Sequence, residues 1–186
     1  GFKEIAVTDW HGQLRVIQNP LSGNPAITTY NTTDIGPHLS MVESGDFDVD
    51  GNEDLAVAGE GGLTLFMGDG SGSFLEGQSF LKSSNASYVA CQDLDEDGVL
   101  DFVHVSNTTD DPAIVLLALE GGALVVKEEI SIGANVGSNN LYAPKVGHLN
   151  SDPWLDIVVP GLMAERIYVI LGESTWGYPD FPNQEI

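Results

Sequence analysis

The sequence has very few cysteines and very few basic residues. Its single cysteine, Cys91, cannot form a disulfide within the chain. Only six lysines and arginines stand against 28 aspartates and glutamates, which gives a formal net charge of -22. A surface of that charge repels phosphate backbones and anionic lipid headgroups. The composition therefore excludes a disulfide framework and argues against a nucleic-acid partner.

The sequence also lacks a membrane-spanning run and the common catalytic motifs. No apolar stretch approaches the ~20 residues that a transmembrane helix requires, and no segment has a convincing helical pattern. There is no G-x-S-x-G elbow, no paired-cysteine metal site and no H-E-x-x-H. We therefore expect a protein without a transmembrane segment and without enzyme activity.

What the sequence does contain is an acidic loop, present in two intact copies. Aspartates at loop positions 1, 3 and 5 alternate with other residues, position 6 is glycine, position 7 offers a backbone carbonyl, and position 9 is aspartate. Hard oxygen ligands in this order suit Ca²⁺, and the glycine permits the sharp bend. The residues at positions 1, 3, 5, 7 and 9 are Asp46, Asp48, Asp50, Asn52 and Asp54 in the first loop, and Asp93, Asp95, Asp97, Val99 and Asp101 in the second.

A third copy keeps the spacing but has lost several ligands. Its corresponding residues are His148, Asn150, Asp152, Trp154 and Asp156, with Pro153 in place of the glycine. The sequence therefore predicts two calcium sites, and weak or absent binding in the third loop. An EF-hand would need a glutamate at position 12 and a helix on each side, whereas short apolar runs of strand length follow these loops.

The copies recur about every 50 residues, which is the period of a propeller blade. We expect an all-β chain, a single repeat domain over 1–186, built from four-stranded antiparallel blades. The expected blade pieces are 1–37 (partial), 38–84, 85–138 and 139–186 (partial). The strands number three, four, four and three, so the first piece lacks its innermost strand and the last its outermost strand.

Together these residues resemble the FG-GAP or VCBS type of repeat. The match rests on Gly45, Asp46, Asp48, Asp50, Gly51, Asp54 and Leu55, and again on Asp93, Asp95, Asp97, Gly98, Asp101 and Phe102. The family includes the integrin α-subunit propeller and many secreted bacterial proteins. The resemblance implies Ca²⁺ in the hairpin between the first two strands of a blade, within a ring that usually has seven blades. About four blade pieces are present, which predicts part of a larger or assembled propeller.

Two features place the protein outside the cell. Loops of this kind, at the affinities of extracellular modules, would be largely empty in a cytosol poor in free calcium. Three sequons, at Asn31, Asn85 and Asn107, fall in expected loops and are candidate N-glycosylation sites. We therefore expect a secreted or cell-surface protein.

Three functional classes are compatible with this sequence. The one we favour is a non-enzymatic, calcium-stabilised adhesion or binding module that takes a protein or glycan ligand. The first alternative is a structural protein that assembles with copies of itself into a filament or ring, because its incomplete terminal blades complete one another. The second is a propeller domain of a polysaccharide-degrading enzyme. Trp10, Trp154 and Trp176 would suit a sugar site, although packing is the commoner role of such residues.

Overall fold

The computed structural model describes residues 4–18, 24–32, 34–81, 87–108, 112–132, 141–161, 166–174, 176–178 and 184–185. All regular structure in these residues is β-strand, arranged in four antiparallel sheets. The first sheet consists of β1 (Glu4–Thr8), β2 (Gln13–Gln18) and β3 (Ala26–Asn31). The second consists of β4 (Met41–Gly45), β5 (Asp54–Gly59), β6 (Gly62–Gly68) and β7 (Phe74–Leu81).

The third and fourth sheets repeat this pattern further along the chain. The third consists of β8 (Ser87–Gln92), β9 (Asp101–Ser106), β10 (Ala113–Glu120) and β11 (Ala123–Ser131). The fourth consists of β12 (Lys145–Gly147), β13 (Asp156–Gly161), β14 (Arg166–Ile170) and β15 (Gln184–Glu185). In every sheet the spatial order of the strands follows the chain order. The expected all-β architecture of propeller-type blades is confirmed.

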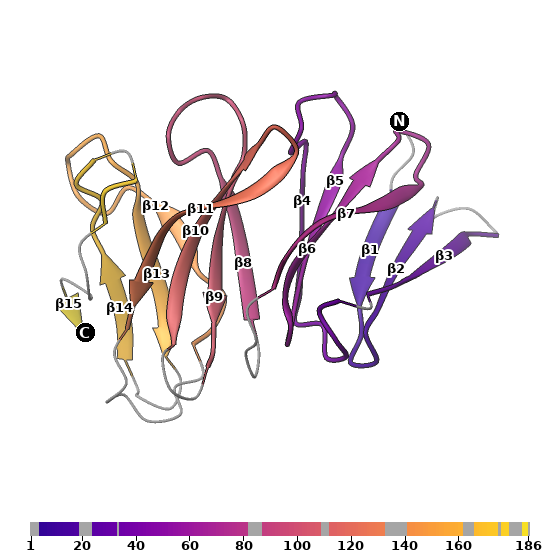
Figure 1. The fold of residues 1–186 in the computed structure, drawn as a ribbon, viewed down its shortest axis with the longest axis horizontal. Coiled ribbons are helices and arrows are strands. Elements are labelled where there is room, and N and C mark those ends of the chain that lie inside the picture. The colour runs from indigo at the N-terminus through magenta and orange to yellow at the C-terminus, as the bar shows by residue number, and fades with distance from the viewer. Residues whose placement is uncertain are drawn as a thin grey trace.

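The four sheets lie side by side as successive blades (Figure 1). A hydrophobic core lies between each neighbouring pair. Leu14 and Val16 pack with Leu55 and Val57 between the first and second sheets. Separate clusters fill the space between the second and third sheets, and between the third and fourth. Each sheet therefore buries its faces against its neighbours rather than forming a core of its own.

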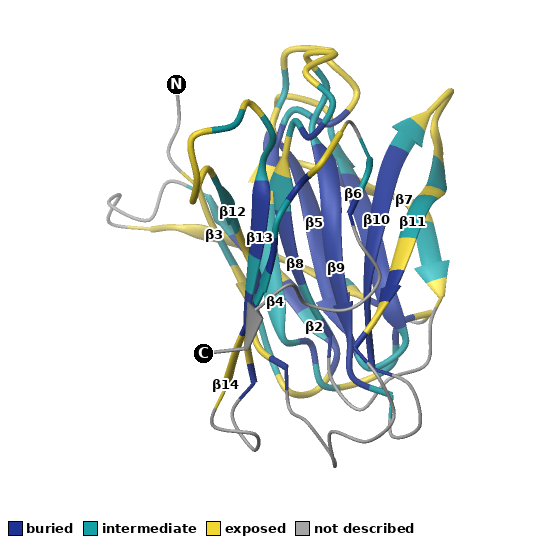
Figure 2. Cartoon of the chain, turned by 90° about the vertical axis from the view of Figure 1, so that its left-hand side faces the viewer, coloured by how far each residue is buried: buried dark blue, intermediate teal, exposed yellow. Residues whose placement is uncertain are grey.

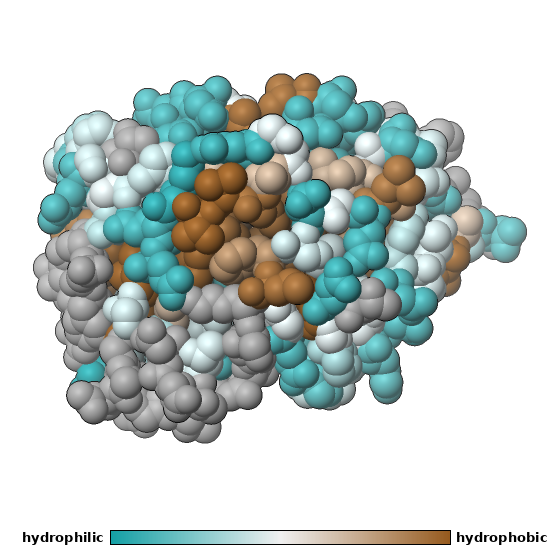
Figure 3. All heavy atoms as spheres, viewed as in Figure 1, coloured by the Kyte–Doolittle hydropathy of each residue, from teal (hydrophilic) through white to brown (hydrophobic). Residues whose placement is uncertain are grey.

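The second strand of each middle sheet is buried along its whole length. Every residue of β5 and β9 is buried, whereas the residues of the outer strands β7 and β11 are exposed or half-buried except for one buried residue in each (Figure 2). Continuous apolar runs such as Leu55–Ala58 fit this position, because both faces of a middle sheet pack against other sheets. Figure 3 shows hydrophobic surface gathered over β7 and β11, whose exposed apolar residues include Leu75, Leu81 and Val126.

The last sheet differs from the expectation at its outer edge. Its fourth strand, β15, pairs with β14 through Tyr168 opposite Glu185 and Val169 opposite Gln184. The expectation that the last sheet lacks its outermost strand is therefore wrong. A two-residue strand is too short to produce an alternating pattern, and nearby prolines in the sequence argue against a ladder. The first sheet has the three strands that were expected.

The acidic loops all lie along one edge of the stack. The β4–β5, β8–β9 and β12–β13 connections are at the top of Figure 1, and the β1–β2 hairpin is at the opposite edge. No helix occurs in the described part of the chain, and hence none there is long and apolar enough to cross a membrane.

Candidate functional site

The first acidic loop brings three carboxylates together. Oxygen atoms of Asp46, Asp48 and Asp50 all lie within 4.8 Å of one another. The loop's own backbone holds them in place: Asp50 N donates to Asp46 Oδ1 at 3.0 Å and to Asp48 Oδ1 at 3.1 Å, and Gly51 N donates to Asp46 Oδ2 at 3.0 Å. The side chains are therefore turned inward by the fold of the loop itself.

The second loop repeats this hydrogen-bond pattern. Asp97 N donates to Asp93 Oδ1 at 3.1 Å and to Asp95 Oδ1 at 3.3 Å, and Gly98 N donates to Asp93 Oδ2 at 3.0 Å. The group within 4.8 Å is different here, since it consists of Asp93, Asp95 and Asp101. Asp97 accepts from Val99 N at 2.8 Å and is not a member of this group.

The two loops share an unusual backbone conformation at position 4 as well as at the glycine. Gly51 and Gly98 both have φ of 90°, as the sharp bend requires. Val49 and Glu96, at position 4, have φ of 61° and 60°. This left-handed conformation is costly for residues with a Cβ, and most of all for a β-branched one. The glycines can be predicted from the sequence, whereas position 4 cannot, because neither valine nor glutamate signals a positive φ.

Asp54, at position 9 of the first loop, faces backbone amides rather than the other carboxylates. Its Oδ2 accepts a hydrogen bond from Phe47 N at 2.8 Å, and its Oδ1 accepts one from Gly68 N at 2.7 Å. Gly68 has to be glycine, because a Cβ there would lie 2.1 Å from the backbone oxygen of Glu53. Burial raises the pKa of Asp54, although these two hydrogen bonds act to lower it. Asp54 thus braces the loop against the next hairpin.

Asp101, at position 9 of the second loop, also accepts a hydrogen bond from a backbone amide of its loop, and in addition it belongs to the carboxylate group. It accepts from Leu94 N at 2.8 Å, as Asp54 does from Phe47. Burial, together with the charges of Asp95, Asp97 and Asp93, raises the pKa of Asp101 to about 7. A buried carboxylate beside others of the same charge is what a bound cation would stabilise.

The third loop keeps the two hydrogen bonds of the position 9 aspartate, although its positions 1 and 3 are no longer aspartates. Asp156 accepts from Leu149 N at 2.7 Å and from Gly172 N at 3.0 Å, the same pair of bonds that Asp54 makes. His148 Nδ1 lies 3.0 Å from Trp154 O. Asn150 accepts from Asp152 N at 2.9 Å, and Asp152 accepts from Trp154 N at 2.9 Å. No group of three acidic, histidine or cysteine ligands forms here among the described residues.

The two intact loops fit a divalent cation by the chemistry of their donors. Each group consists of carboxylate oxygens only, and hard oxygen ligands favour Ca²⁺ over softer metals. At position 7, Asn52 donates from N and Nδ2 to the two carboxylate oxygens of Asp50, at 2.8 and 2.9 Å. The side chains at positions 1, 3 and 5 of the first loop, and at positions 1, 3 and 9 of the second, would therefore hold the ion.

The three sequons lie in different surroundings. Asn31 is exposed at the end of β3, in a strand rather than the loop that was expected. Asn107 is only 4% exposed, and its side chain donates to Leu141 O and accepts from Leu141 N, both at 2.8 Å. This burial argues against a glycan at Asn107. The sequon itself does not reveal the contact with Leu141. Asn85 lies outside the described residues.

The three tryptophans do not line a common site. Trp154 and Trp176 are half-buried near the second loop, and Trp176 packs against the core between the third and fourth sheets. Trp10 lies in the β1–β2 hairpin at the opposite edge of the stack and is 70% exposed. Packing thus accounts for two of them, while Trp10 remains available at the surface.

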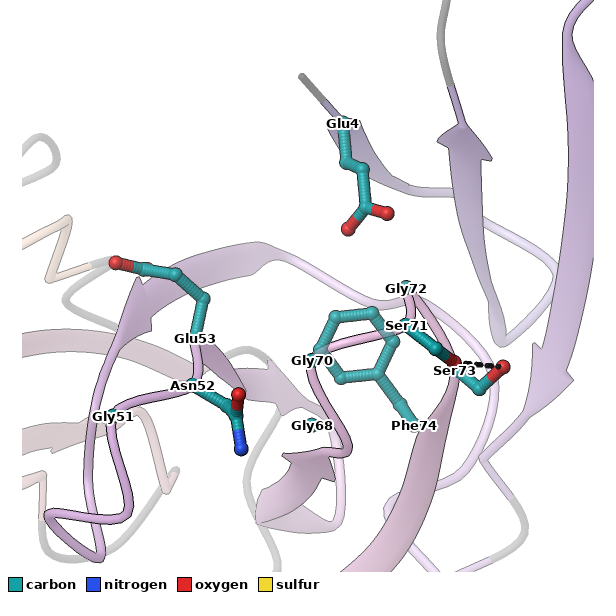
Figure 4. A pocket seen from close by; sticks show the side chains of 10 residues that line it. All are labelled: Glu4, Gly51, Asn52, Glu53, Gly68, Gly70, Ser71, Gly72, Ser73 and Phe74. Carbon is teal, nitrogen blue, oxygen red and sulfur yellow. Dashed lines mark hydrogen bonds between the residues drawn. The ribbon is translucent and has the colours of Figure 1, made fainter. Parts of the chain in front are cut away.

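A cleft of about 510 Å³ lies beside the first loop, between the first and second sheets (Figure 4). One wall is the end of the loop, Gly51–Glu53, and the other is the β6–β7 turn and Glu4. The Glu4 side chain points toward the turn at Gly72, whereas that of Glu53 points away from it. Gln18 Nε2 donates to Gly72 O at 2.8 Å, which ties this turn to the first sheet.

Comparison with known families agrees with the repeat found in the sequence. A search of curated proteins found no match to the chain. Residues 46–104 match the model of a family described as the FG-GAP-like repeat, and this span contains both intact acidic loops. Repeats of this family form propeller blades, which is the architecture of the four sheets. The chain therefore carries an FG-GAP-like repeat.

Proposed function

We propose that this protein is an extracellular recognition module whose blade hairpins are held by calcium. The observation that supports this most directly is the convergence of three carboxylates in each of two loops with the same internal hydrogen bonds. Carboxylates this close repel one another, and a bound cation turns the repulsion into attraction. Calcium would then stabilise the folded blades, since the unfolded chain does not present the site.

The same loops support the proposed extracellular location. Sites with three protein carboxylates match the weak calcium affinities of extracellular modules, at which free calcium outside cells is sufficient. The exposed sequon at Asn31 is compatible with passage through a secretory pathway. The net charge of -22 disfavours nucleic acid as a partner. We assign no catalytic role, because the carboxylates with distinctive spacing belong to the loops.

For recognition of a protein or a glycan, the best-placed residue is Trp10. Its ring packs against His38 with 4.3 Å between the ring centroids and a tilt of 37°, and His38 Nδ1 lies 2.5 Å from Glu60 Oε1. The hairpin is fixed to the following crossover, because His38 N donates to Trp10 O and Leu39 N donates to Asp9 O. A rigidly presented, exposed indole loses little freedom on binding, which favours it as an anchor.

Assembly with copies of itself is the second candidate, and it rests on the outer faces of the end sheets. On the first sheet, Ile5, Ile17 and Ile27 lie directly opposite one another, and Ile5 and Ile27 are 48% and 60% exposed. On the fourth sheet, Val158 pairs with Val169 on the face away from the core. A free sheet face normally carries polar residues, so apolar rows favour a further sheet packing there.

The calcium proposal is tested by urea unfolding in about 1 mM Ca²⁺ and in excess chelator. When the free calcium concentration is 100 times the dissociation constant of a site, binding at that site should add about 2.7 kcal/mol to the free energy of unfolding. Asp48→Asn and Asp95→Asn should each remove part of this gain. Asp69→Asn is the matched control, because Asp69 accepts backbone hydrogen bonds in the tight β6–β7 turn and belongs to neither carboxylate group. Equal stability in both buffers would refute the proposal.

Recognition and assembly have separate readouts. A glycan array probed with the wild type and with Trp10→Ala asks whether the exposed indole binds sugars; signal that survives the substitution would exclude Trp10 as the anchor. Light scattering coupled to size exclusion gives the mass in solution, to be compared with 19.8 kDa for one chain. Assembly predicts a multiple of that mass, which Ile27→Lys should reduce to a single copy.

A further inference from the structure

The second acidic loop is contacted by a residue from beyond the fourth sheet's β14 strand. Trp176 Nε1 donates a hydrogen bond to Asp95 Oδ2 at 3.2 Å. Asp95 also accepts from Asp97 N within its own loop, so both of its oxygens are held. The two residues are 81 positions apart in the sequence. Nothing in the spacing of the repeat predicts this contact.

The degenerate third loop also lies against the second. A crevice of only about 40 Å³ separates them, and its walls are Leu94, Asp95 and Glu96 on one side and Pro153, Trp154 and Leu155 on the other. Although the third loop lacks the carboxylate group of an ion site, it forms one side of the surroundings of Asp95. The second loop is therefore enclosed on the side that faces the fourth sheet.

Trp176 is itself fixed in place. It has φ of 58°, a strained conformation for a large side chain that persists only where the surroundings impose it. The turn is closed by Gly177 N donating to Ser174 O at 3.0 Å. Lys127 Nζ lies 5.3 Å from the centroid of the Trp176 ring, and Tyr178 N donates to Glu128 at 3.2 Å. Residues 176–178 are thus docked on β11 of the third sheet.

In the part of the chain that the structure describes, the first loop has no equivalent support. Among the described residues, Asp46, Asp48 and Asp50 accept hydrogen bonds only from within their own loop. The side of that loop toward the first sheet borders the open cleft of about 510 Å³. Two loops with the same aspartate and glycine positions therefore differ in how firmly their carboxylates are oriented.

We propose that Trp176 is a positioning residue for calcium in the second loop, an inference that rests on the proposed function. Its N–H directs the Asp95 carboxylate, as hydrogen-bond partners of metal ligands commonly do. A preoriented ligand loses less freedom on binding, so the second loop binds calcium more tightly than the first. By reciprocity, calcium in the second loop strengthens the docking of residues 176–178 on the third sheet. Calcium is thereby coupled to the contact between the third and fourth blades.

The test is isothermal titration of the metal-stripped chain with Ca²⁺. The wild type should show two sites of unequal affinity, and Asp95→Asn should remove the tighter and Asp48→Asn the weaker. Trp176→Phe keeps the aromatic ring but removes the N–H, and should weaken the tighter site about 10- to 100-fold while leaving the other unchanged. Trp10→Phe, at the opposite edge, is the matched control and should leave both sites as they are.

The outcomes separate the inference from the function on which it rests. Two sites in the wild type with the same affinities in Trp176→Phe would overturn the positioning role and leave the calcium proposal standing. No binding in the wild type would overturn both. A second measurement keeps Trp176, so it tests the inference even if the Trp176→Phe chain fails to fold. In a Trp10→Phe, Trp154→Phe protein, the fluorescence of Trp176 should change as the tighter site fills, and should not respond to calcium when Asp95→Asn is added; an emission that ignores calcium would refute the inference.

Discussion

Gly68 N donates a hydrogen bond of 2.7 Å to Asp54 Oδ1, which joins the acidic loop of the second blade to the turn that follows β6. The same relationship holds between Gly172 N and Asp156 Oδ1 at 3.0 Å in the fourth blade. Because the third loop preserves this bond without the carboxylate group of the intact loops, position 9 has a structural role that does not depend on metal. Removal of the position 9 carboxylate should therefore have a different signature from removal of a ligand.

Asp54→Ala should destabilise the protein in calcium and in chelator alike. The substitution leaves the amides of Phe47 and Gly68 without their acceptor, and each unsatisfied buried amide costs about 1–3 kcal/mol. Asp48→Ala, by contrast, should lower stability mainly when calcium is present. Urea unfolding in both buffers distinguishes the two. A loss for Asp54→Ala that appears only in calcium would mean that Asp54 acts as a ligand.

Val49→Asn should stabilise the first loop. Val49 has φ of 61° and is 61% exposed, so its side chain gains little from packing while its backbone is strained. Asparagine tolerates the left-handed conformation, and relief of a cost of about 1–2 kcal/mol is the upper limit of the gain. Ser151→Asn is the control, because Ser151 holds position 4 of the third loop and does not have positive φ. Equal effects at the two positions would contradict this explanation.

Much of the architecture can be predicted from sequence because it depends on local patterns. The runs Leu55–Ala58 and Phe102–Val105 are short, mostly apolar and bounded by loops, and both become buried strands. The acidic loops fold through bonds between residues two to five positions apart, so their spacing alone specifies them. In both cases the sequence pattern and the structure refer to the same few residues.

The remaining features depend on contacts between distant residues, which no local pattern reports. The position 9 aspartates have the same spacing in both intact loops, yet Asp101 joins a carboxylate group and Asp54 does not. The difference arises from Gly68, because its N–H, 14 residues away in the sequence, donates a hydrogen bond to the second carboxylate oxygen of Asp54. The contact between Trp176 and Asp95 and the burial of Asn107 against Leu141 are likewise products of packing between blades.

The metal-stripped protein should lose stability as the pH rises toward neutrality. Burial raises the pKa of Asp101 from 3.8 to about 7, so the folded state holds this proton more tightly than the unfolded state. Its contribution to stability is fully present below about pH 4 and is lost as the pH rises through about 7. Asp101→Asn removes the titrating group and should flatten this part of the profile.

Urea midpoints of the metal-stripped wild type and of Asp101→Asn, measured from pH 4 to 8, check this expectation. Asparagine can still accept the hydrogen bond from Leu94 N, so the difference between the two profiles isolates the charge. With calcium present the trend should reverse, because the ion binds the deprotonated carboxylate. Parallel profiles for the two proteins without metal would contradict the assignment.

Glycosylation should distinguish the two sequons that the structure describes. Asn107 Nδ2, the atom that would carry the sugar, is buried and donates to Leu141 O, whereas Asn31 is exposed. A glycan on Asn107 would break both of its bonds to Leu141 and expel a buried side chain from between blades, at a cost of about 1–3 kcal/mol for each unsatisfied group. Expressed in a secretory host, the folded protein should carry sugar at Asn31 and none at Asn107, as read from glycopeptide masses. Asn31→Gln should remove that glycan without changing the urea midpoint, while Asn107→Gln should lower the midpoint; a folded fraction with sugar on Asn107 would show that this blade contact is dispensable.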